Sequence, residues 1–339
     1  MNINKVLEQL SNGHHLSNIQ MQEVIKNCMT GDLSDVQTAA FLALMRMKGE
    51  TVEELTAAAT IMTEYARPIH LGSGLVDIVG TGGDGKNTFN ISTISSFVVA
   101  AAGLPIAKHG SHSVSSRSGS ADFLLQAGFE LELSDQALAD CIEQCQIAFL
   151  FGPHFHPAMR HVRRARQQLG IRTLFNLLGP LLNPAGVKRQ VVGVFDKQWL
   201  KPVAQVLAHI GSERALVVSS DDGLDEISIA ACTHVMEYHN SELKSWVIDP
   251  KRYHCYHPNL DAIIVENPAE SLIIAEAVFS GASGPARDIV VLNAAAVLYC
   301  GGLCLDFESA IEKARLAIDS GLAKHRFNQL RELTQTCKP

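Results

Sequence analysis

The chain has 339 residues, of which 47% are hydrophobic and 19% charged, a composition typical of a folded, soluble protein that is large enough for two domains. Its formal net charge of −7 gives no basic excess, so we expect no nucleic-acid partner. No run of about 18 uninterrupted apolar residues occurs, which argues against a transmembrane helix and a membrane partner.

The first 72 residues are predicted to form a small all-helical domain. Three capping boxes, which are typical of helix N-termini, each precede a helical pattern of apolar residues. They are Ser17-x-x-Gln20, Ser34-x-x-Gln37 and Thr51-x-x-Glu54. The apolar side chains of Met45 and Met47 are expected at the surface of this domain. They could form part of a dimer interface there, although packing inside the domain would account for them equally.

From residue 73 to residue 339, short apolar segments alternate with helical ones, which favours a large α/β domain. Strands are expected at 76–79, 104–108, 147–151, 190–195, 215–219, 233–238 and 246–248. Helices are expected at 92–102, 121–127, 135–145, 199–210, 269–280 and 287–299. This order predicts a mainly parallel central sheet covered by helices. Ligands of such sheets bind at the carboxyl ends of the strands.

A glycine-rich loop follows the first of these strands, with glycines at 80, 82, 83 and 85. A strand, a glycine loop and a helix start present backbone N–H groups to a phosphate. The loop fits the dinucleotide fingerprint only in part, because no acidic residue stands about 20 positions further on to hold a ribose. It fits the P-loop motif only in part as well, because Asn87 replaces the magnesium-binding hydroxyl and Thr88 comes one residue late. The P-loop hypothesis is weakened but not excluded, and a glycine turn without a ligand is the remaining alternative.

Two further loops at predicted strand ends carry many polar side chains. The loop from Lys108 to Asp122 contains an arginine and six serines, and it either wraps a diphosphate or sugar phosphate or is simply flexible. The turn from Asp221 to Glu226 contains four carboxylates, which either bind magnesium or are merely solvated. Together with the glycine loop, they predict a magnesium–phosphate site.

The segment 156–184 is predicted to connect the two domains. It begins as a helix, with Pro157 in the first turn, and Arg163 and Arg166 share one face of that helix. Residues 171–184 are interrupted by glycine and proline, and we expect them to form an extended crossing between the domains.

Seven motifs resemble those of the anthranilate phosphoribosyltransferase family, and they occur in the family's order. They are GTGGD (80–84), NIST (90–93), KHG (108–110), SS-x-SGSAD (115–122), HPAM (156–159), R-x-x-LG-x-RT-x-FN-x-LGPL-x-NP (166–184) and DG-x-DE (222–226). Their joint occurrence over most of the chain is highly specific, whereas any single glycine motif is not.

The resemblance implies an enzyme of tryptophan biosynthesis that transfers the phosphoribosyl group of 5-phosphoribosyl 1-pyrophosphate to the amine of anthranilate and releases diphosphate. It implies Mg²⁺ as the cofactor, ligands bound between the two domains, and usually a homodimer. The eight cysteines never form a C-x-x-C pair, which indicates buried thiols in a reducing compartment. We therefore expect a cytoplasmic protein.

The resemblance also implies a role for individual residues. The expected catalytic residues are Lys108, Asp84 and Arg166. Phosphoribosyl pyrophosphate is expected to bind to Gly80, Gly83, Asp84, Thr88, Asn90, Ser92, Thr93, Lys108, Ser116 and Ser120. Anthranilate is expected to bind to Gly80, His109, Ser111 and Arg166. The expected magnesium ligands are Ser92, Asp225 and Glu226.

One departure from the family pattern lies on the acceptor side. The family usually reads KHGNR, whereas this chain has Ser111 and His112 after Gly110. Losing one buried contact of the asparagine can cost about 1 kcal/mol. Weaker acceptor binding, a compensating contact and a different aromatic acceptor are the open explanations. A related nucleoside phosphorylase and a non-catalytic binding protein are alternatives of other classes, although the residues expected to hold metal and diphosphate are all present.

Overall fold

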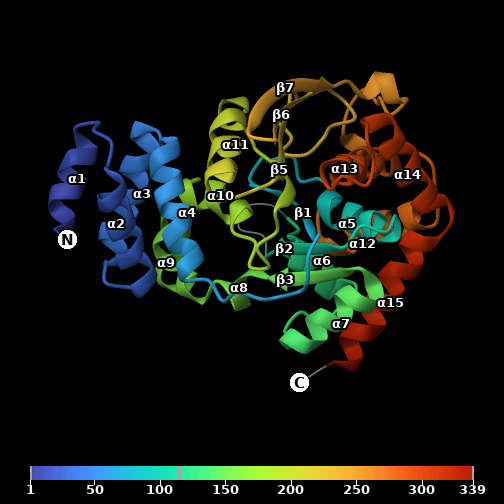
Figure 1. Cartoon of the computed structure of the whole chain (residues 1–339), viewed down its shortest axis with the longest axis horizontal. Helices are drawn as coiled ribbons and strands as arrows, with labels where there is room; N and C mark the ends of the chain where they lie inside the picture. The colour runs from blue at the N-terminus through green and yellow to red at the C-terminus, as the bar shows by residue number, and fades with distance from the viewer. Residues whose placement is uncertain (1, 113–116, 338–339) are drawn as a thin grey trace.

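The computed structural model describes residues 2–112 and 117–337, and Figure 1 shows a group of helices at one side of an α/β unit. The N-terminal helices are α1 (Ile3–Ser11), α2 (Asn18–Thr30), α3 (Asp35–Lys48) and α4 (Val52–Glu64). All three predicted capping boxes are confirmed, because the side chains of Ser17, Ser34 and Thr51 accept from the backbone of the first turns that follow them. Two later helices, α9 (Arg160–Leu169) and α10 (Leu174–Leu178), pack against this group.

A single seven-stranded sheet forms the centre of the described α/β unit, in the order β3-β2-β1-β4-β5-β6-β7. The strands are β1 (Val76–Gly80), β2 (Ile106–Gly110), β3 (Ile147–Phe151), β4 (Arg189–Gly193), β5 (Arg214–Ser220), β6 (Thr233–His239) and β7 (Glu242–Ile248). The first five are parallel, and β6 and β7 add an antiparallel hairpin, which confirms the mainly parallel sheet. The strand order reverses at β1, whose neighbours are β2 and β4. Sheets of this kind bind ligands at such a point.

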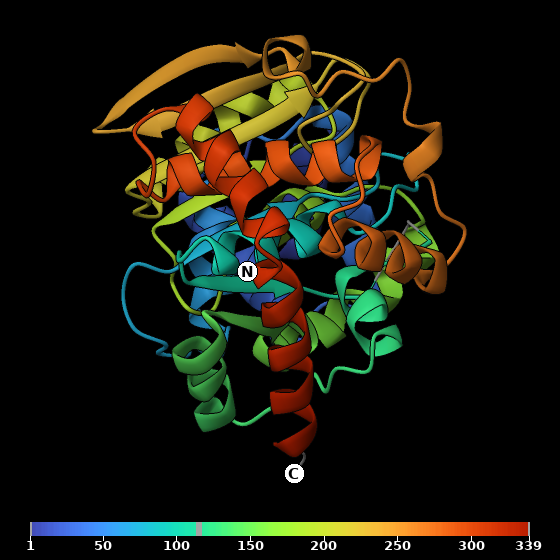
Figure 2. The same ribbon diagram turned by 90° about the vertical axis from the view of Figure 1, so that its right-hand side faces the viewer.

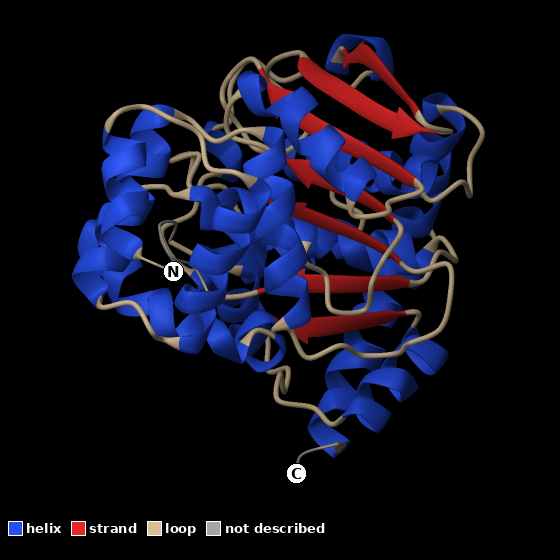
Figure 3. Ribbon diagram, turned by 60° about the vertical axis from the view of Figure 1, so that its left-hand side comes forward, coloured by secondary structure: helices blue, strands red, loops and turns tan. Residues whose placement is uncertain are grey.

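Helices cover both faces of the sheet, as Figure 3 shows. The remaining helices are α5 (Ile91–Ala101), α6 (Ser120–Gln126), α7 (Asp135–Cys145), α8 (Gly152–Phe155), α11 (Leu200–His209), α12 (Pro268–Phe279), α13 (Pro285–Cys300), α14 (Phe307–Asp319) and α15 (Leu322–Thr336). Figure 2 shows α13, α14 and α15, in orange and red, on one side of the sheet. Residues 289–298 of α13 are all buried, because this helix is apolar almost all round.

The helical group and the sheet share one apolar core on the other face. Val192 of β4, Val217 of β5, Val203 of α11 and Leu55 of α4 belong to the same buried cluster. Burial of this surface holds the small domain against the sheet. None of the helices in the described ranges is long and apolar enough to cross a membrane.

Two expectations about local structure were wrong, and three further helices of the α/β unit were not predicted. Residues 171–184 contain α10 and a 3₁₀ turn (Gly179–Leu181) rather than an extended crossing, because the Asn176 side chain accepts from the Thr173 N–H at 3.0 Å and starts a helix. Met45 is buried in the helical core, whereas Met47 is 72% exposed as expected. The unpredicted helices are α8, α14 and α15.

Candidate active site

The glycine loop after β1 lies directly against the acidic turn after β5. The Gly82 N–H donates to Oδ2 of Asp225 at 2.6 Å, and the Thr81 N–H donates to the Gly193 carbonyl at 2.9 Å. Gly82 and Gly83 have positive φ, which an L side chain rarely adopts, so the loop needs glycine at both positions. Two predicted sites, far apart in the sequence, therefore meet at the carboxyl ends of the strands.

The carboxylates of Asp84, Asp225 and Glu226 lie close together where the glycine loop meets the acidic turn. Burial, together with the charges of Asp84 and Glu226, raises the pKa of Asp225 well above its ordinary value. Burial also raises the pKa of Glu226 to about 7, although Lys108 and Ser92 act in the opposite direction. Buried carboxylates that repel one another are costly unless a cation offsets their charge. This cluster is therefore suited to a divalent cation.

The donor set fits magnesium bound together with a phosphate ligand. No group of three or more His, Cys, Asp or Glu side chains within the described ranges forms a complete metal site by itself. Mg²⁺ usually takes only one or two carboxylates and completes its shell with substrate phosphates and water. Asp225 and Glu226 can supply the carboxylates, and the Ser92 hydroxyl lies beside Glu226 and can supply a third oxygen.

Lys108 lies at the base of the same cluster. Its Nζ donates to the Ile78 carbonyl at 2.7 Å and to Oγ of Ser92 at 3.2 Å. Burial lowers the pKa of the Lys108 ammonium, and the charges of Asp77 and Glu226 counteract this effect. A buried cation next to a helix start can stabilise a departing diphosphate.

The other residues expected to bind the donor follow the glycine loop or lie in the serine loop, which runs from Lys108 to Asp122. Thr88 pairs with Ile264 in an isolated β-bridge. The hydroxyl of Thr93 is buried and has no hydrogen-bond partner among the described residues. Ser120 donates to the Ser111 carbonyl at 3.3 Å, so it lies beside a residue that is expected to bind the acceptor. Ser116 lies outside the described residues.

The residues expected to bind the acceptor come from two parts of the structure, which are β2 with the loop after it and helix α9. His109 of β2 is buried, and burial, together with the charges of His156 and Lys108, lowers its pKa to about 3, so the ring is neutral. Its Nε2 has no hydrogen-bond partner among the described residues, and its ring lies 5.0 Å from that of His156 between centroids. Ser111 is exposed at the end of β2.

Arg166 comes from α9, which packs on the small helical domain. Its guanidinium lies 5.5 Å from the centroid of the Phe175 ring, and burial lowers its pKa. It has no carboxylate partner in the part of the chain that the structure describes. A partly buried guanidinium without a counter-charge is suited to an anionic ligand.

The structure divides the four carboxylates of the acidic turn into two pairs. Asp221 is bound by Lys197 and by His234, and the hydrogen bond from Lys197 lowers its pKa. The carboxylate of Asp222 accepts hydrogen bonds from Ser220 and Ser228. Only Asp225 and Glu226 face the glycine loop and Ser92, so the first two carboxylates stabilise the turn itself.

Two residues of the site were not predicted. Asp77 of β1 is fully buried, and its carboxylate accepts from the backbone N–H groups of Ile78 and His109 and from Nδ2 of Asn183 at 2.8 Å. Asn183 also donates to the Ala107 carbonyl at 2.8 Å. The sequence did contain a signal for Asp77, because it is a single carboxylate inside an otherwise apolar strand. A buried charge needs polar partners, so a hydrogen-bonded role could have been predicted.

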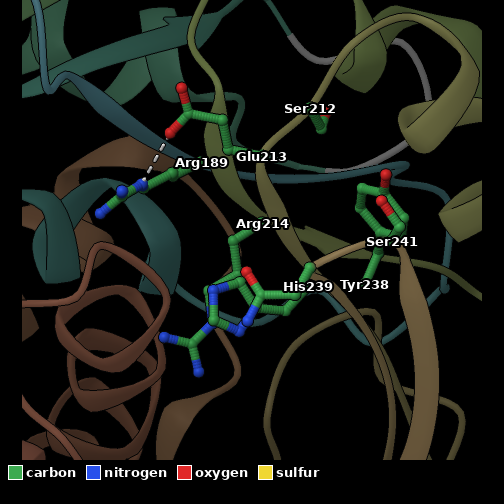
Figure 4. A pocket seen from close by; sticks show the side chains of 8 residues that line it. Arg189, Ser212, Glu213, Arg214, Tyr238, His239 and Ser241 are labelled. Atoms are coloured by element: carbon green, nitrogen blue, oxygen red, sulfur yellow. Dashed lines mark hydrogen bonds and ion pairs between the residues drawn. The ribbon is translucent and has the colours of Figure 1, made fainter.

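A pocket of about 410 Å³ lies at the opposite end of the sheet, at the start of β4 and β5 (Figure 4). Its two arginines already have partners. Arg189 donates to Glu213 and to the Gly301 carbonyl, and Arg214 donates to Glu237 and to the Tyr299 carbonyl. They bind the C-terminal end of α13, where cations are favourable. We therefore place the candidate site at the glycine loop.

Known proteins resemble the chain over nearly its whole length. The family models described as "Glycosyl transferase family, helical bundle domain" and "Glycosyl transferase family, a/b domain" match residues 4–66 and 72–324. Anthranilate phosphoribosyltransferase of Legionella pneumophila (strain Corby) is 65% identical over 331 residues, which cover 98% of this chain and 96% of that protein.

Two solved structures share the fold. Anthranilate phosphoribosyltransferase of Thermus thermophilus has a TM-score of 0.91 and 36% identity, covering 99% of this chain and 100% of its own. The enzyme of Saccharomyces cerevisiae, in complex with PRPP and Mg, has a TM-score of 0.90 and 27% identity and covers 98% of both chains.

Proposed function

The chain belongs to the anthranilate phosphoribosyltransferase family, and we propose that it transfers the phosphoribosyl group of phosphoribosyl pyrophosphate to anthranilate in tryptophan biosynthesis, with Mg²⁺ as the cofactor. The observation that carries the assignment of the site is the meeting of the glycine loop, Lys108 and the pair Asp225–Glu226. A phosphate cradle, a buried cation and two metal-binding carboxylates are the groups that a diphosphate donor needs.

The reaction forms one bond and breaks one bond at C1 of the ribosyl group. The amine nitrogen of anthranilate bonds to C1, the bond from C1 to the diphosphate oxygen breaks, and the nitrogen then loses a proton to water. Lys108 and the N-terminus of α5 stabilise the negative charge that develops on the diphosphate. Mg²⁺ held by Asp225, Glu226 and Ser92 would supply further positive charge to the same group.

On the acceptor side, positioning matters more than base catalysis, because an aromatic amine is uncharged at neutral pH. Arg166 would form a charge-assisted pair with the carboxylate of anthranilate. His109 is buried and neutral, so it can offer the acceptor a hydrogen bond without adding charge. Gly80 and Ser111 would complete this subsite.

We further propose a homodimer in the cytoplasm. Ile19 of α2, Val36 of α3 and Met47 of α3 are large apolar side chains that are more than 70% exposed on the helical domain, which suits an interface between copies of the chain. All eight cysteines are free thiols, and most of them are buried, which suits a reducing compartment.

The test is turnover by the purified protein with phosphoribosyl pyrophosphate, Mg²⁺ and anthranilate, followed as the loss of anthranilate fluorescence. We expect turnover that stops when a chelator removes the metal. Diphosphate release with another aromatic amine, but not with anthranilate, would overturn the acceptor assignment. Cleavage of nucleosides by inorganic phosphate, without use of phosphoribosyl pyrophosphate, would overturn the whole proposal.

A further inference from the structure

Asn90 precedes α5 but does not cap it. An asparagine at this position usually accepts a hydrogen bond from the second or third N–H group of the helix. Here the side chain of Asn90 makes no such bond. The first turn of α5, which carries Ser92 and Thr93, is therefore not closed by its own asparagine.

Two serines from distant segments hold the Asn90 amide instead. Ser271 of α12 and Ser118 of the serine loop each donate a hydroxyl hydrogen bond to Oδ1 of Asn90, both at 2.8 Å. These two bonds occupy both lone pairs of the oxygen. The backbone N–H of Asn90 also donates to Oγ of Ser271 at 3.1 Å. Ser271 is fully buried and 181 residues away in the sequence, so this contact is made by the tertiary fold.

The orientation of the amide follows from a third contact. Nδ2 of Asn90 donates to the Ser118 carbonyl at 3.1 Å. The flipped amide would set its oxygen against that carbonyl oxygen, and two acceptors repel each other. One N–H of Nδ2 is thus committed to Ser118. The other is available to a ligand, since an amide nitrogen carries two donors.

The first turn of α5 carries features that suit an anion. The N-terminus of this 11-residue helix has a partial positive charge. The hydroxyl of Thr93 is buried there and has no partner among the described residues. If the side-chain oxygen of Asn90 accepted hydrogen bonds from this turn, it would occupy backbone N–H groups that could otherwise bind a phosphate.

We propose that Ser271 is a positioning residue of the donor site. By holding Oδ1 of Asn90 away from α5, it keeps the first turn of the helix open to the diphosphate of the donor. It also directs the free N–H of the Asn90 amide toward the same ligand. This inference rests on the proposed function. It adds a residue from the last third of the chain that touches neither substrate.

The test compares Ser271→Ala with Ser95→Ala as a matched control. Ser95 is also fully buried, and its hydroxyl donates to the Val290 carbonyl at 3.3 Å without any contact to Asn90. Ser271→Ala removes both hydrogen bonds between the Ser271 hydroxyl and Asn90, and this loss should raise the donor KM by about fivefold to tenfold. The anthranilate KM should stay within about twofold, since no acceptor group is involved. The control should leave both KM values unchanged.

Ser271→Thr separates the positioning role from a merely structural one. It keeps the hydroxyl but adds a methyl group at a buried position, so it should lower the melting temperature while the donor KM stays near that of the wild type. The proposal is overturned if Ser271→Ala leaves the donor KM unchanged. It is also overturned if both serine-to-alanine variants raise the two KM values together, or if Ser271→Thr raises the donor KM as much as Ser271→Ala does.

Binding of Mg²⁺ with inorganic diphosphate, measured by calorimetry, distinguishes this inference from the proposed function. If the wild type binds diphosphate but does not turn over anthranilate, the proposed function fails, and weaker diphosphate binding by Ser271→Ala still supports the role of Ser271. If the wild type turns over and Ser271→Ala binds diphosphate equally well, only the inference fails. If the wild type binds no diphosphate, both fail.

Discussion

Gly193, at the end of β4, lies against the main chain of Asp225. A Cβ atom on Gly193 would overlap the carbonyl oxygen of Asp225 and would stand 2.6 Å from its carbonyl carbon. Backbone cannot move aside as a flexible side chain can, so Gly193→Ala must displace the turn that carries Asp225 and Glu226. A shift of about 1 Å at a catalytic group can lower the rate about 100-fold.

We therefore expect Gly193→Ala to lower kcat/KM by about 100-fold and to raise the Mg²⁺ concentration needed for half-maximal rate. Initial rates over a magnesium titration measure both effects. The matched control is Gly179→Ala, because a Cβ on Gly179 meets no atom within 4 Å and its φ is −48°. Equal magnesium dependence in the two variants would contradict this account of the turn.

Arg166 is expected to bind the acceptor and not the donor. Arg166→Ala should raise the KM for anthranilate by about tenfold to 100-fold, the range for losing a hydrogen bond to a charged group, and should change the donor KM little. Steady-state kinetics with each substrate varied in turn measure the difference. Arg163→Ala is the control, since Arg163 lies one turn away on α9 and is exposed. A similar rise in both KM values would show that Arg166 does not act on the acceptor alone.

Asp77 is expected to make stability depend on pH in the acidic range. Burial raises its pKa from 3.8 to about 6, although Lys108 and the hydrogen bonds from Asn183, His109 and Ile78 lower it. The folded state therefore binds more protons than the unfolded state between these two values. The stability that Asp77 contributes is fully present below about pH 4 and is lost as pH rises through about 6.

Asp77→Asn removes this titration. We expect its destabilisation relative to the wild type to be largest near pH 4 and to shrink by about 3 kcal/mol by pH 7, as urea unfolding at several pH values would show. Asp135→Asn gives a control of opposite sign, because the hydrogen bond from Arg67 lowers the pKa of Asp135. That variant should differ from the wild type more at pH 7 than in acid well below pH 3.8, where the folded-state carboxylate of Asp135 becomes protonated. Parallel stability curves for Asp77→Asn and the wild type would be the contrary result.

Local sequence patterns predicted most of the fold. Helix α7 begins and ends as expected, because the Ser134 side chain accepts from the Ala137 N–H and an amphipathic pattern follows. Strand β3 is also as expected, since five apolar residues between turns form a fully buried strand. Helix α14 was not predicted, although the Asp306 side chain accepts from the Ser309 N–H and supplied a starting signal. Residues 171–184 were misjudged because a local cap outweighed the glycine and proline signals.

The candidate site was harder to predict because its contacts are tertiary. Chain order places the three loops at strand ends, but it does not say which carboxylates face the glycine loop. Asp221 instead pairs with Lys197 and His234, which lie on other elements. Asn183 reaches Asp77 across 106 residues, and Ser271 reaches Asn90 across 181. No local pattern encodes such pairs.

Ser111 stands where the family usually has an asparagine, and hydrogen bonds to its carbonyl oxygen hold its main chain in place. Its carbonyl accepts from the Ala121 N–H at 3.2 Å and from Oγ of Ser120 at 3.3 Å. Among the described residues its hydroxyl has no partner, and its side chain is exposed. A longer polar side chain can therefore be introduced without breaking a hydrogen bond of the folded protein.

We expect Ser111→Asn to lower the KM for anthranilate by about fivefold, because one added hydrogen bond contributes about 1 kcal/mol. The donor KM serves as the internal control and should not change, since Lys108 and the glycine loop are untouched. Steady-state rates with anthranilate and with a ring-substituted aminobenzoate measure the effect. If Ser111→Asn weakens anthranilate binding while the wild type prefers the substituted acceptor, then serine fits a larger acceptor and the departure from the family motif reflects a change of specificity.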